Sequence, residues 1–157
     1  ILDLLDDDAD TWRSDAELSR LVDMMAPLHR RRFEAALADP RRRVGAVYRR
    51  IRVEAGVRVQ RAEIRYDGLA GCLRTPGGGS SRQLLVVTER GRARLRMLNA
   101  REAARLMGAP EGYRLADSET AALKVLGDGV SVPAVRWLSR HLLAPLAASR
   151  PPLGAAA

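Results

Sequence analysis

The apolar residues of this 157-residue chain change their spacing twice, and these two changes restrict its fold more than any single motif does. Residues 14–37 carry apolar side chains every three or four positions, as at Leu21 and Met25, which indicates a helix. Residues 44–98 approach the two-residue alternation of strands, and residues 99–148 return to helical spacing. This order predicts an α+β chain with an N-terminal helix, a small β-rich lobe and C-terminal helices.

The first helix has a recognisable beginning and end. Ser14, followed three residues later by Glu17, forms the pattern of a capping box, in which each residue satisfies a free backbone N–H of the other. Pro27 interrupts the helical pattern and is expected to kink it. An Asp-Pro pair then ends the helix before a basic linker of three arginines. We assign residues 1–43 to an acidic segment and this helix.

The β-rich lobe is assigned to residues 44–93. Val and Ile alternate with charged residues over 57–66, and Asp67-Gly68 predicts a turn after them. Residues 84–87 form a short apolar run, and residues 93–97 alternate apolar side chains with arginines. A glycine-containing turn separates these two stretches, so the sequence predicts a hairpin.

Residues 94–148 are assigned to C-terminal helices, and residues 149–157 to a disordered tail rich in Pro and Ala. Asn99 begins a second capping pattern, while Ser118 and Ser131 can cap two further helices. Pro133 falls in the first turn of the last helix, where proline is tolerated. That helix has an expected apolar face formed by Val135, Leu138, Leu142 and Leu143.

The net charge of +8 is unevenly distributed. Residues 1–26 carry eight acidic residues and two arginines, whereas residues 27–105 carry twenty arginines and seven acidic residues. Such a basic stretch is typical of a surface that binds a polyanion. However, a GC-rich genome also favours arginine, and Lys124 is the only lysine of the chain. Charge by itself leaves both a nucleic-acid surface and a solvated basic face open.

Composition excludes several kinds of site. Cys72 is the single cysteine, which excludes an intrachain disulfide and a zinc cluster, and we expect it to be buried. His29 and His141 lie on separate predicted helices without ligand-spaced partners, so no metal is expected. No apolar run reaches the roughly 18 residues of a membrane span, and no signal peptide is recognisable. These features predict a cytoplasmic protein without a membrane partner.

Two stretches resemble conserved motifs of one enzyme family. Residues 94–113 run Arg-Leu-Arg-Met-Leu-Asn-Ala-Arg-Glu-Ala-Ala-Arg-Leu-Met-Gly-Ala-Pro-Glu-Gly-Tyr, a strand followed by an Arg-Glu helix and a Gly-x-Pro-x-x-Tyr turn. Residues 126–135 run Leu-Gly-Asp-Gly-Val-Ser-Val-Pro-Ala-Val, a glycine turn that opens the last helix. In this order and spacing they are similar to the ninth and tenth motifs of cytosine-5 DNA methyltransferases. The resemblance covers residues 94–145.

The resemblance implies a DNA-binding role for the preceding residues, because this family places its target-recognition domain before the ninth motif. A glycine-rich stretch, residues 71–83, occupies that position. Arginine can pair with guanine and glutamine with adenine in the major groove of double-stranded DNA, while serine hydroxyls suit phosphates. A solvated hairpin loop is the alternative. The candidate DNA-binding residues are Arg74, Thr75, Gly78, Gly79, Ser80, Ser81, Arg82 and Gln83.

The family's chemistry implies a partner for this chain. In the family a Pro-Cys cysteine attacks a cytosine flipped out of the duplex, and S-adenosylmethionine donates the methyl group. The sequence has no Pro-Cys, since Cys72 follows Gly71, and it also lacks the family's Glu-Asn-Val and Phe-x-Gly-x-Gly motifs. We use the term catalytic half for the segment or chain that carries these motifs. The 157 residues alone are predicted to be inactive.

Two smaller groups of residues take roles from the resemblance. Asp128, Gly129 and Ser131 correspond to the turn beside the methionine end of S-adenosylmethionine, although the family's usual Asn is replaced by Asp128. A carboxylate there would repel the cofactor carboxylate, and a helix-to-helix joint without a ligand is the alternative. Arg101 and Glu102 open the helix that braces the recognition domain in the family. The alternative role for these two residues is that Glu102 only caps the helix and Arg101 is an ordinary surface residue.

Three origins of the chain remain open at this level. It is a C-terminal part of one longer enzyme, the small subunit of a split methyltransferase, or a stand-alone DNA-binding module that lacks catalysis. The first residue, Ile1, is not a start methionine, which favours the longer enzyme. A general basic interaction domain is a further alternative, and it predicts no sequence preference and a steep salt dependence. Restriction-modification, phage defence and regulation are all compatible settings.

Overall fold

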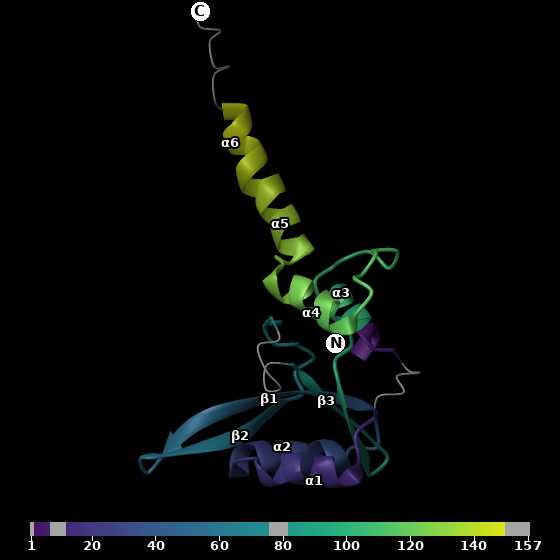
Figure 1. The fold of residues 1–157 in the computed structure, drawn as a ribbon, viewed down its shortest axis with the longest axis vertical. Coiled ribbons are helices and arrows are strands. Elements are labelled where there is room, and N and C mark those ends of the chain that lie inside the picture. The colour runs from purple at the N-terminus through teal and green to yellow at the C-terminus, as the bar shows by residue number, and fades with distance from the viewer. Residues whose placement is uncertain (1, 7–11, 76–81, 150–157) are drawn as a thin grey trace, which may run out of the picture.

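The computed structural model describes residues 2–6, 12–75 and 82–149. The expected α+β class is confirmed, with helices packed on a four-stranded antiparallel sheet (Figure 1). In chain order the elements are a 3-10 helix η1 (Leu2–Leu4), α1 (Asp15–Asp23), α2 (Pro27–Ala38), β1 (Arg43–Glu54), β2 (Val57–Arg65), β3 (Leu84–Glu89), β4 (Arg92–Met97), α3 (Ala100–Leu106), α4 (Glu119–Asp128), α5 (Val132–Leu138), a π-helical turn η2 (Ser139–Leu143) and α6 (Ala144–Ser149).

The sheet has the strand order β2-β1-β3-β4, with every neighbouring pair antiparallel. Val44 of β1 lies opposite Val87 of β3, and Val86 of β3 lies opposite Leu95 of β4. The predicted hairpin is therefore present as β3 and β4. Because β4 begins at Arg92, the boundary expected between residues 93 and 94 falls inside a strand of this sheet.

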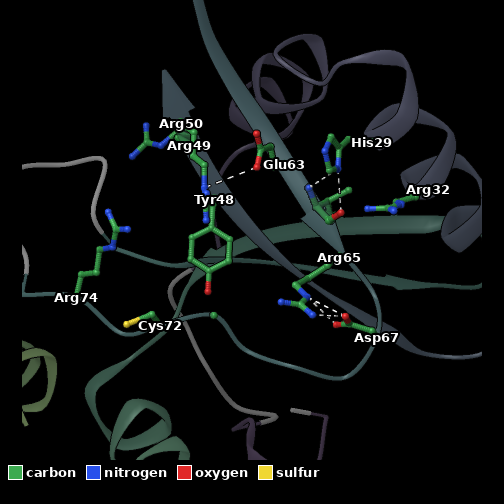
Figure 2. Close-up of a pocket in the computed structure, with 12 residues that line it drawn as sticks. His29, Arg32, Tyr48, Arg49, Arg50, Glu63, Arg65, Asp67, Cys72 and Arg74 are labelled. Atoms are coloured by element: carbon green, nitrogen blue, oxygen red, sulfur yellow. Dashed lines mark hydrogen bonds and ion pairs between the residues drawn. The ribbon is translucent and has the colours of Figure 1, made fainter. Parts of the chain in front are cut away.

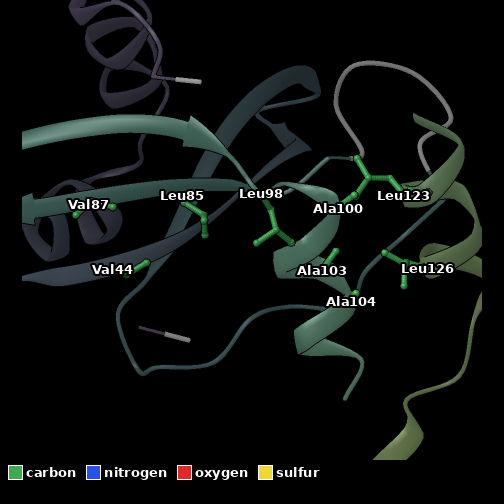
Figure 3. Packing of buried hydrophobic residues seen from close by; sticks show 10 residues of the cluster. Val44, Leu85, Val87, Leu98, Ala100, Ala103, Ala104, Leu123 and Leu126 are labelled. Carbon is green, nitrogen blue, oxygen red and sulfur yellow. The ribbon is translucent and has the colours of Figure 1, made fainter. Parts of the chain in front are cut away.

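Helices cover both faces of the sheet, so β3 and the first part of β1 are buried on both sides. α1, α2 and the connection between them pack on one face through Leu21, Phe33 and Met25, where they meet Val86 and other sheet residues. α3 and α4 lie on the opposite face (Figures 1 and 3). Alternation then explains the continuous apolar run of β3, because successive side chains point to opposite, equally buried faces. The core between this second face and the helices α3 and α4 is formed by Val44, Leu85, Val87, Leu98, Ala100, Ala103, Ala104, Ala122, Leu123 and Leu126 (Figure 3).

The single kinked helix expected before residue 38 is wrong, because α1 and α2 are two helices. α1 begins with the predicted Ser14–Glu17 capping box. Ala26 has extended backbone geometry, as a residue that precedes a proline prefers, and Pro27 begins α2. Between the helices the Ala62 backbone N–H donates to the carbonyl of Met24 at 3.0 Å. The break therefore becomes a contact with the edge strand β2.

A two-stranded ribbon extends beyond the rest of the sheet. Only Arg43–Val47 of β1 pair with β3, whereas the rest of β1 pairs with β2 alone. Ala55 and Gly56 join the two strands, both at positive φ, as a tight hairpin turn requires. The three arginines expected to be a linker instead lead directly into β1, which begins at Arg43.

The C-terminal helices α5, η2 and α6 form a continuous arm that projects away from the sheet (Figure 1). The expected Ser131 side-chain cap is not formed, while Pro133 does lie in the first turn. No residue of the arm is buried, and its exposed apolar side chains are Val132, Val135, Trp137, Leu138, Leu142, Leu143 and Leu146. None of the helices in the described ranges is long and apolar enough to cross a membrane. Ser149 ends α6, and residues 150–157 lie outside the described ranges.

Candidate nucleic-acid interface and cofactor-side turn

A basic cleft of about 520 Å³ lies between α2, the β1–β2 strands and the segment 71–74 (Figure 2). Five arginines line it, together with two carboxylates that are both ion-paired. Glu63 lies 3.7 Å from Arg50 Nε, and Asp67 pairs with Arg65. The lining therefore has an excess of positive charge, as a phosphate-binding surface requires. The lining residues are His29, Arg32, Tyr48, Arg49, Arg50, Glu63, Ile64, Arg65, Asp67, Gly71, Cys72 and Arg74.

Tyr48 connects this cleft to the candidate DNA-binding stretch. Its hydroxyl donates to Gln83 Oε1 at 2.6 Å, and partial burial raises its pKa above the usual value for tyrosine. A Cβ on Gly71 would overlap the Tyr48 hydroxyl, so only glycine allows the chain to pass this close. Gln83 is itself only 5% exposed. In this conformation Gln83 supports Tyr48 and does not present its amide to a DNA base.

The other predicted DNA-binding residues are separated by the structure. Arg74 is exposed and lines the basic cleft, whereas Thr75 is partly buried against α4. Arg82 Nη2 donates to Glu119 Oε1 of α4 at 2.5 Å. Gly78, Gly79, Ser80 and Ser81 lie outside the described residues.

The tenth-motif glycine turn is built differently from the sequence expectation. Gly127 and Asp128, which the sequence places in a glycine turn, instead lie in the last turn of α4, which is capped at Gly129. A Cβ on Gly127 would overlap the backbone of Thr75 and lie 2.5 Å from the Arg74 carbonyl carbon. The Thr75 hydroxyl also donates to Asp128 Oδ1. Gly127 thus permits the close approach of two backbones, and Asp128 accepts a hydrogen bond from the candidate DNA-binding segment.

The rest of the tenth-motif turn packs on the end of α3. The Val132 backbone N–H donates to the Met107 carbonyl at 2.8 Å. Gly108 has φ of +74°, and a Cβ there would overlap Pro133. Ser131 is partly buried, and its side chain forms no capping hydrogen bond. Gly129 is exposed. The turn therefore presents a hydroxyl and backbone groups on an open surface.

Glu102 has a much more buried environment than simple capping requires. It completes the predicted capping box with Asn99, and its side chain is fully buried. Its two carboxylate oxygens accept from Arg96 at 2.5 and 2.7 Å, and the Asp6 backbone N–H donates to it at 2.9 Å. Arg101 is different, since it is only partly buried and donates to the Glu111 carbonyl at 2.9 Å.

Sequence reasoning missed Arg96 and Asp6 as partners of this helix. Arg96 alternates with apolar neighbours on β4, so its position in the pattern suggested a solvent-facing residue. Asp6 lies in the acidic N-terminal segment, far from α3 in sequence, yet Arg105 donates to its Oδ1 at 2.5 Å. The hydrogen bonds from Arg105 and Asn99 lower the pKa of Asp6 below its usual value. The segment is thereby attached to α3, which no local pattern could indicate.

The cysteine and one of the histidines lie in different surroundings. Cys72 is exposed, so the expectation of a buried thiol is wrong. The segment that carries it packs on the sheet through Leu73 instead. His29 Nδ1 lies 3.1 Å from the backbone nitrogen of Ile64, next to β2. Among the described residues, no three His, Cys, Asp or Glu side chains gather as a metal site would require.

Comparison with known proteins identifies the chain through one family model. Residues 37–144 match the model of the C-5 cytosine-specific DNA methylases. The match begins at the end of α2, includes the whole sheet and the helices α3 and α4, and ends at the start of α6. No curated protein and no solved structure matches the chain.

Proposed function

Because the chain belongs to the C-5 cytosine-specific DNA methylase family, we propose that it recognises double-stranded DNA and completes a cytosine-5 DNA methyltransferase. In this proposal the cysteine nucleophile and most of the cofactor site are contributed by the catalytic half, in the same or another chain. The sheet and the segment 71–83 contribute DNA contacts. The arm α5–η2–α6 contributes the closing contacts.

The basic cleft is the observation that carries the DNA-binding part. Its arginines approach from a helix, two strands and the segment 71–74, so the fold gathers charges that are dispersed in sequence. Phosphate contacts supply most of the affinity of such surfaces, and base contacts supply the specificity. We assign phosphate contacts to Arg50 and base contacts to Arg74, which projects from the segment beside the cleft (Figure 2). Thr75, Arg82 and the serines and glycines between them complete the proposed contact region.

S-adenosylmethionine, which the family uses as methyl donor, fits only partly to the residues of this chain. Ser131 offers a hydroxyl, and the backbone at Gly129 is accessible, which suits the edge of a polar ligand. The Asp128 carboxylate would repel another carboxylate, and one of its oxygens already accepts the hydrogen bond from Thr75. We therefore assign this turn to the rim of the cofactor site. Arg101 and Glu102 are structural in the proposal, because both make contacts within the chain.

DNA binding by the 157-residue chain tests the first part, and two arginines are expected to behave differently. Arg50→Ala should weaken binding about equally for all duplexes and reduce the salt slope by about 1, as loss of a phosphate contact does. Arg74→Ala should selectively weaken the preferred duplex, by about fivefold to 150-fold, as loss of a base contact does. Fluorescence anisotropy at several salt concentrations measures both effects. The preferred duplex is the one that the wild-type chain enriches from a random duplex library.

Arg114→Ala is the matched control, because Arg114 is exposed and does not line the cleft. It removes the same charge and should leave affinity and salt slope nearly unchanged. Equal small losses for all three variants would contradict a defined DNA site. A steep salt slope without any enriched sequence would favour the general basic interaction domain. Enrichment of a sequence by a chain that never supports methyl transfer with a catalytic half would favour the stand-alone DNA-binding module.

A further inference from the structure

Helix α4 contacts the chain at both ends of the segment that joins Thr75 to Arg82. At one end, the Thr75 hydroxyl donates to Asp128, and the backbone of residues 74–75 lies directly on Gly127. At the other end, Arg82 is ion-paired with Glu119 at 2.5 Å. Asp128 and Glu119 are the last and first residues of α4, so one helix spans the distance between the two attachments.

The contact at Gly127 is fixed by core packing on both sides. α4 itself is held by Ala122, Leu123 and Leu126, which are buried in the core cluster of that sheet face. Leu73, immediately before Arg74, packs against the same cluster. The backbone of residues 74–75 is therefore confined between Leu73, which is partly buried against the core, and a helix whose glycine leaves room for it.

We propose that Gly127 and Asp128 are positioning residues that hold the backbone at Arg74 and Thr75, so that the Arg74 side chain is directed into the DNA-binding cleft. The pair Arg82–Glu119 holds the other end of the same segment. This inference rests on the proposed function, because it assumes that Arg74 contacts DNA. It adds a role for the tenth-motif turn that is separate from the cofactor, and it links that turn to target recognition.

The first test needs no DNA. Trypsin cleaves after arginine, and both attachment points carry one, Arg74 and Arg82. If opening precedes cleavage, the cleavage rate follows the population of the detached state. Asp128→Ala should therefore increase cleavage at Arg74 by about threefold to tenfold, the range expected for loss of one hydrogen bond. Asp128→Asn keeps an acceptor oxygen and should restore most of the protection.

Gly127→Ala provides an independent variant. Alanine favours a helix more than glycine does, so the substitution should not weaken α4 by itself. Its Cβ would displace residues 74–75, and cleavage at Arg74 should increase at least as much as in Asp128→Ala. Unchanged cleavage in both Asp128→Ala and Gly127→Ala overturns the inference, whether or not the chain binds DNA. A wild-type chain that binds no duplex overturns the proposed function, while the cleavage result still decides whether α4 holds the segment.

The second test separates the charge of Asp128 from its positioning role by measuring DNA binding. Asp128→Ala removes a negative charge, and by electrostatics alone it should slightly strengthen binding to every duplex and leave the preference between duplexes unchanged. If the residue positions Arg74, the preference for the enriched duplex over the unselected library should instead fall by about threefold to tenfold. Asp117→Ala removes an exposed carboxylate from the loop before α4 and serves as the charge control. Its preference should equal that of the wild-type chain.

A double-mutant cycle identifies the residue through which Asp128 acts. If Asp128 works by placing Arg74, then adding Asp128→Ala to Arg74→Ala should cause little further loss of preference. Independent contributions would make the two losses multiply. The assignment of Asp128 as a positioning residue is overturned if the losses of preference multiply in the double variant. It is also overturned if Asp128→Ala loses no more preference than Asp117→Ala does.

Discussion

Glu102→Gln should lower the free energy of unfolding by about 3–5 kcal/mol, the range for breaking a buried ion pair on one side. The glutamine has nearly the same shape, so the loss comes from charge rather than from a cavity. Arg96 is 1% exposed and would keep its positive charge without a carboxylate partner. For a chain of this length the midpoint of thermal unfolding should fall by roughly 6–20 °C. Circular dichroism during heating and in denaturant measures both quantities.

Glu111→Gln is the matched control for this change. Glu111 pairs with Arg105 at 2.7 Å and the same six-residue separation, but its side chain is 66% exposed. An exposed pair contributes about 1 kcal/mol or less, so the control should be nearly as stable as the wild-type chain. Adding Arg96→Met to Glu102→Gln should recover part of the loss, because no unpaired charge then remains. A normal melting midpoint for Glu102→Gln would contradict the buried pair.

Methyl transfer should require the catalytic half and should depend on the exposed face of the arm α5–η2–α6. The 157-residue chain alone should transfer no methyl group from S-adenosylmethionine to cytosine, because its sequence has no Pro-Cys. A catalytic half from the same or a neighbouring reading frame should restore the reaction when mixed with it. Detectable cytosine methylation by the purified chain alone would overturn this division of roles.

Leu138→Glu combined with Leu142→Glu should then reduce the restored activity by roughly 100-fold or more, since burial of two leucines contributes about 3 kcal/mol or more. Both side chains are exposed here, so the folded chain itself should keep its stability. Leu28→Glu, at an equally exposed position on α2, is the control and should leave activity unchanged. Equal activity of the double variant and this control would contradict docking through the arm.

The local elements of this fold follow from short-range patterns in the sequence. Ser14 with Glu17 and Asn99 with Glu102 form the capping boxes that their spacing predicts, because both partners lie within one helical turn. The β3–β4 hairpin follows in the same way from alternation around a glycine turn. The family could likewise be inferred from residues 94–145, because conserved motifs keep their order and spacing, and the family match includes nearly all of them.

Contacts between residues on different elements were decided only by the tertiary structure. Arg96 reads as a surface residue on an alternating strand, yet packing of α3 on the sheet buries it against Glu102. Gln83 is turned inward to Tyr48, and Cys72 is left exposed, because the segment packs through Leu73. Gly127 is a helical residue whose missing side chain admits residues 74–75.

The physical reason is range. Sequence by itself determined the two capping boxes, the hairpin and the family, since hydrogen bonds within one turn and alternation within one strand depend on neighbouring residues. The tertiary structure alone decided which arginine is buried, which arginines share the basic cleft, and which helix holds Arg74 and Thr75. Those outcomes depend on how whole elements pack, because the paired residues lie on different elements: Arg96 on β4 and Glu102 on α3, or Thr75 in a loop and Asp128 on α4.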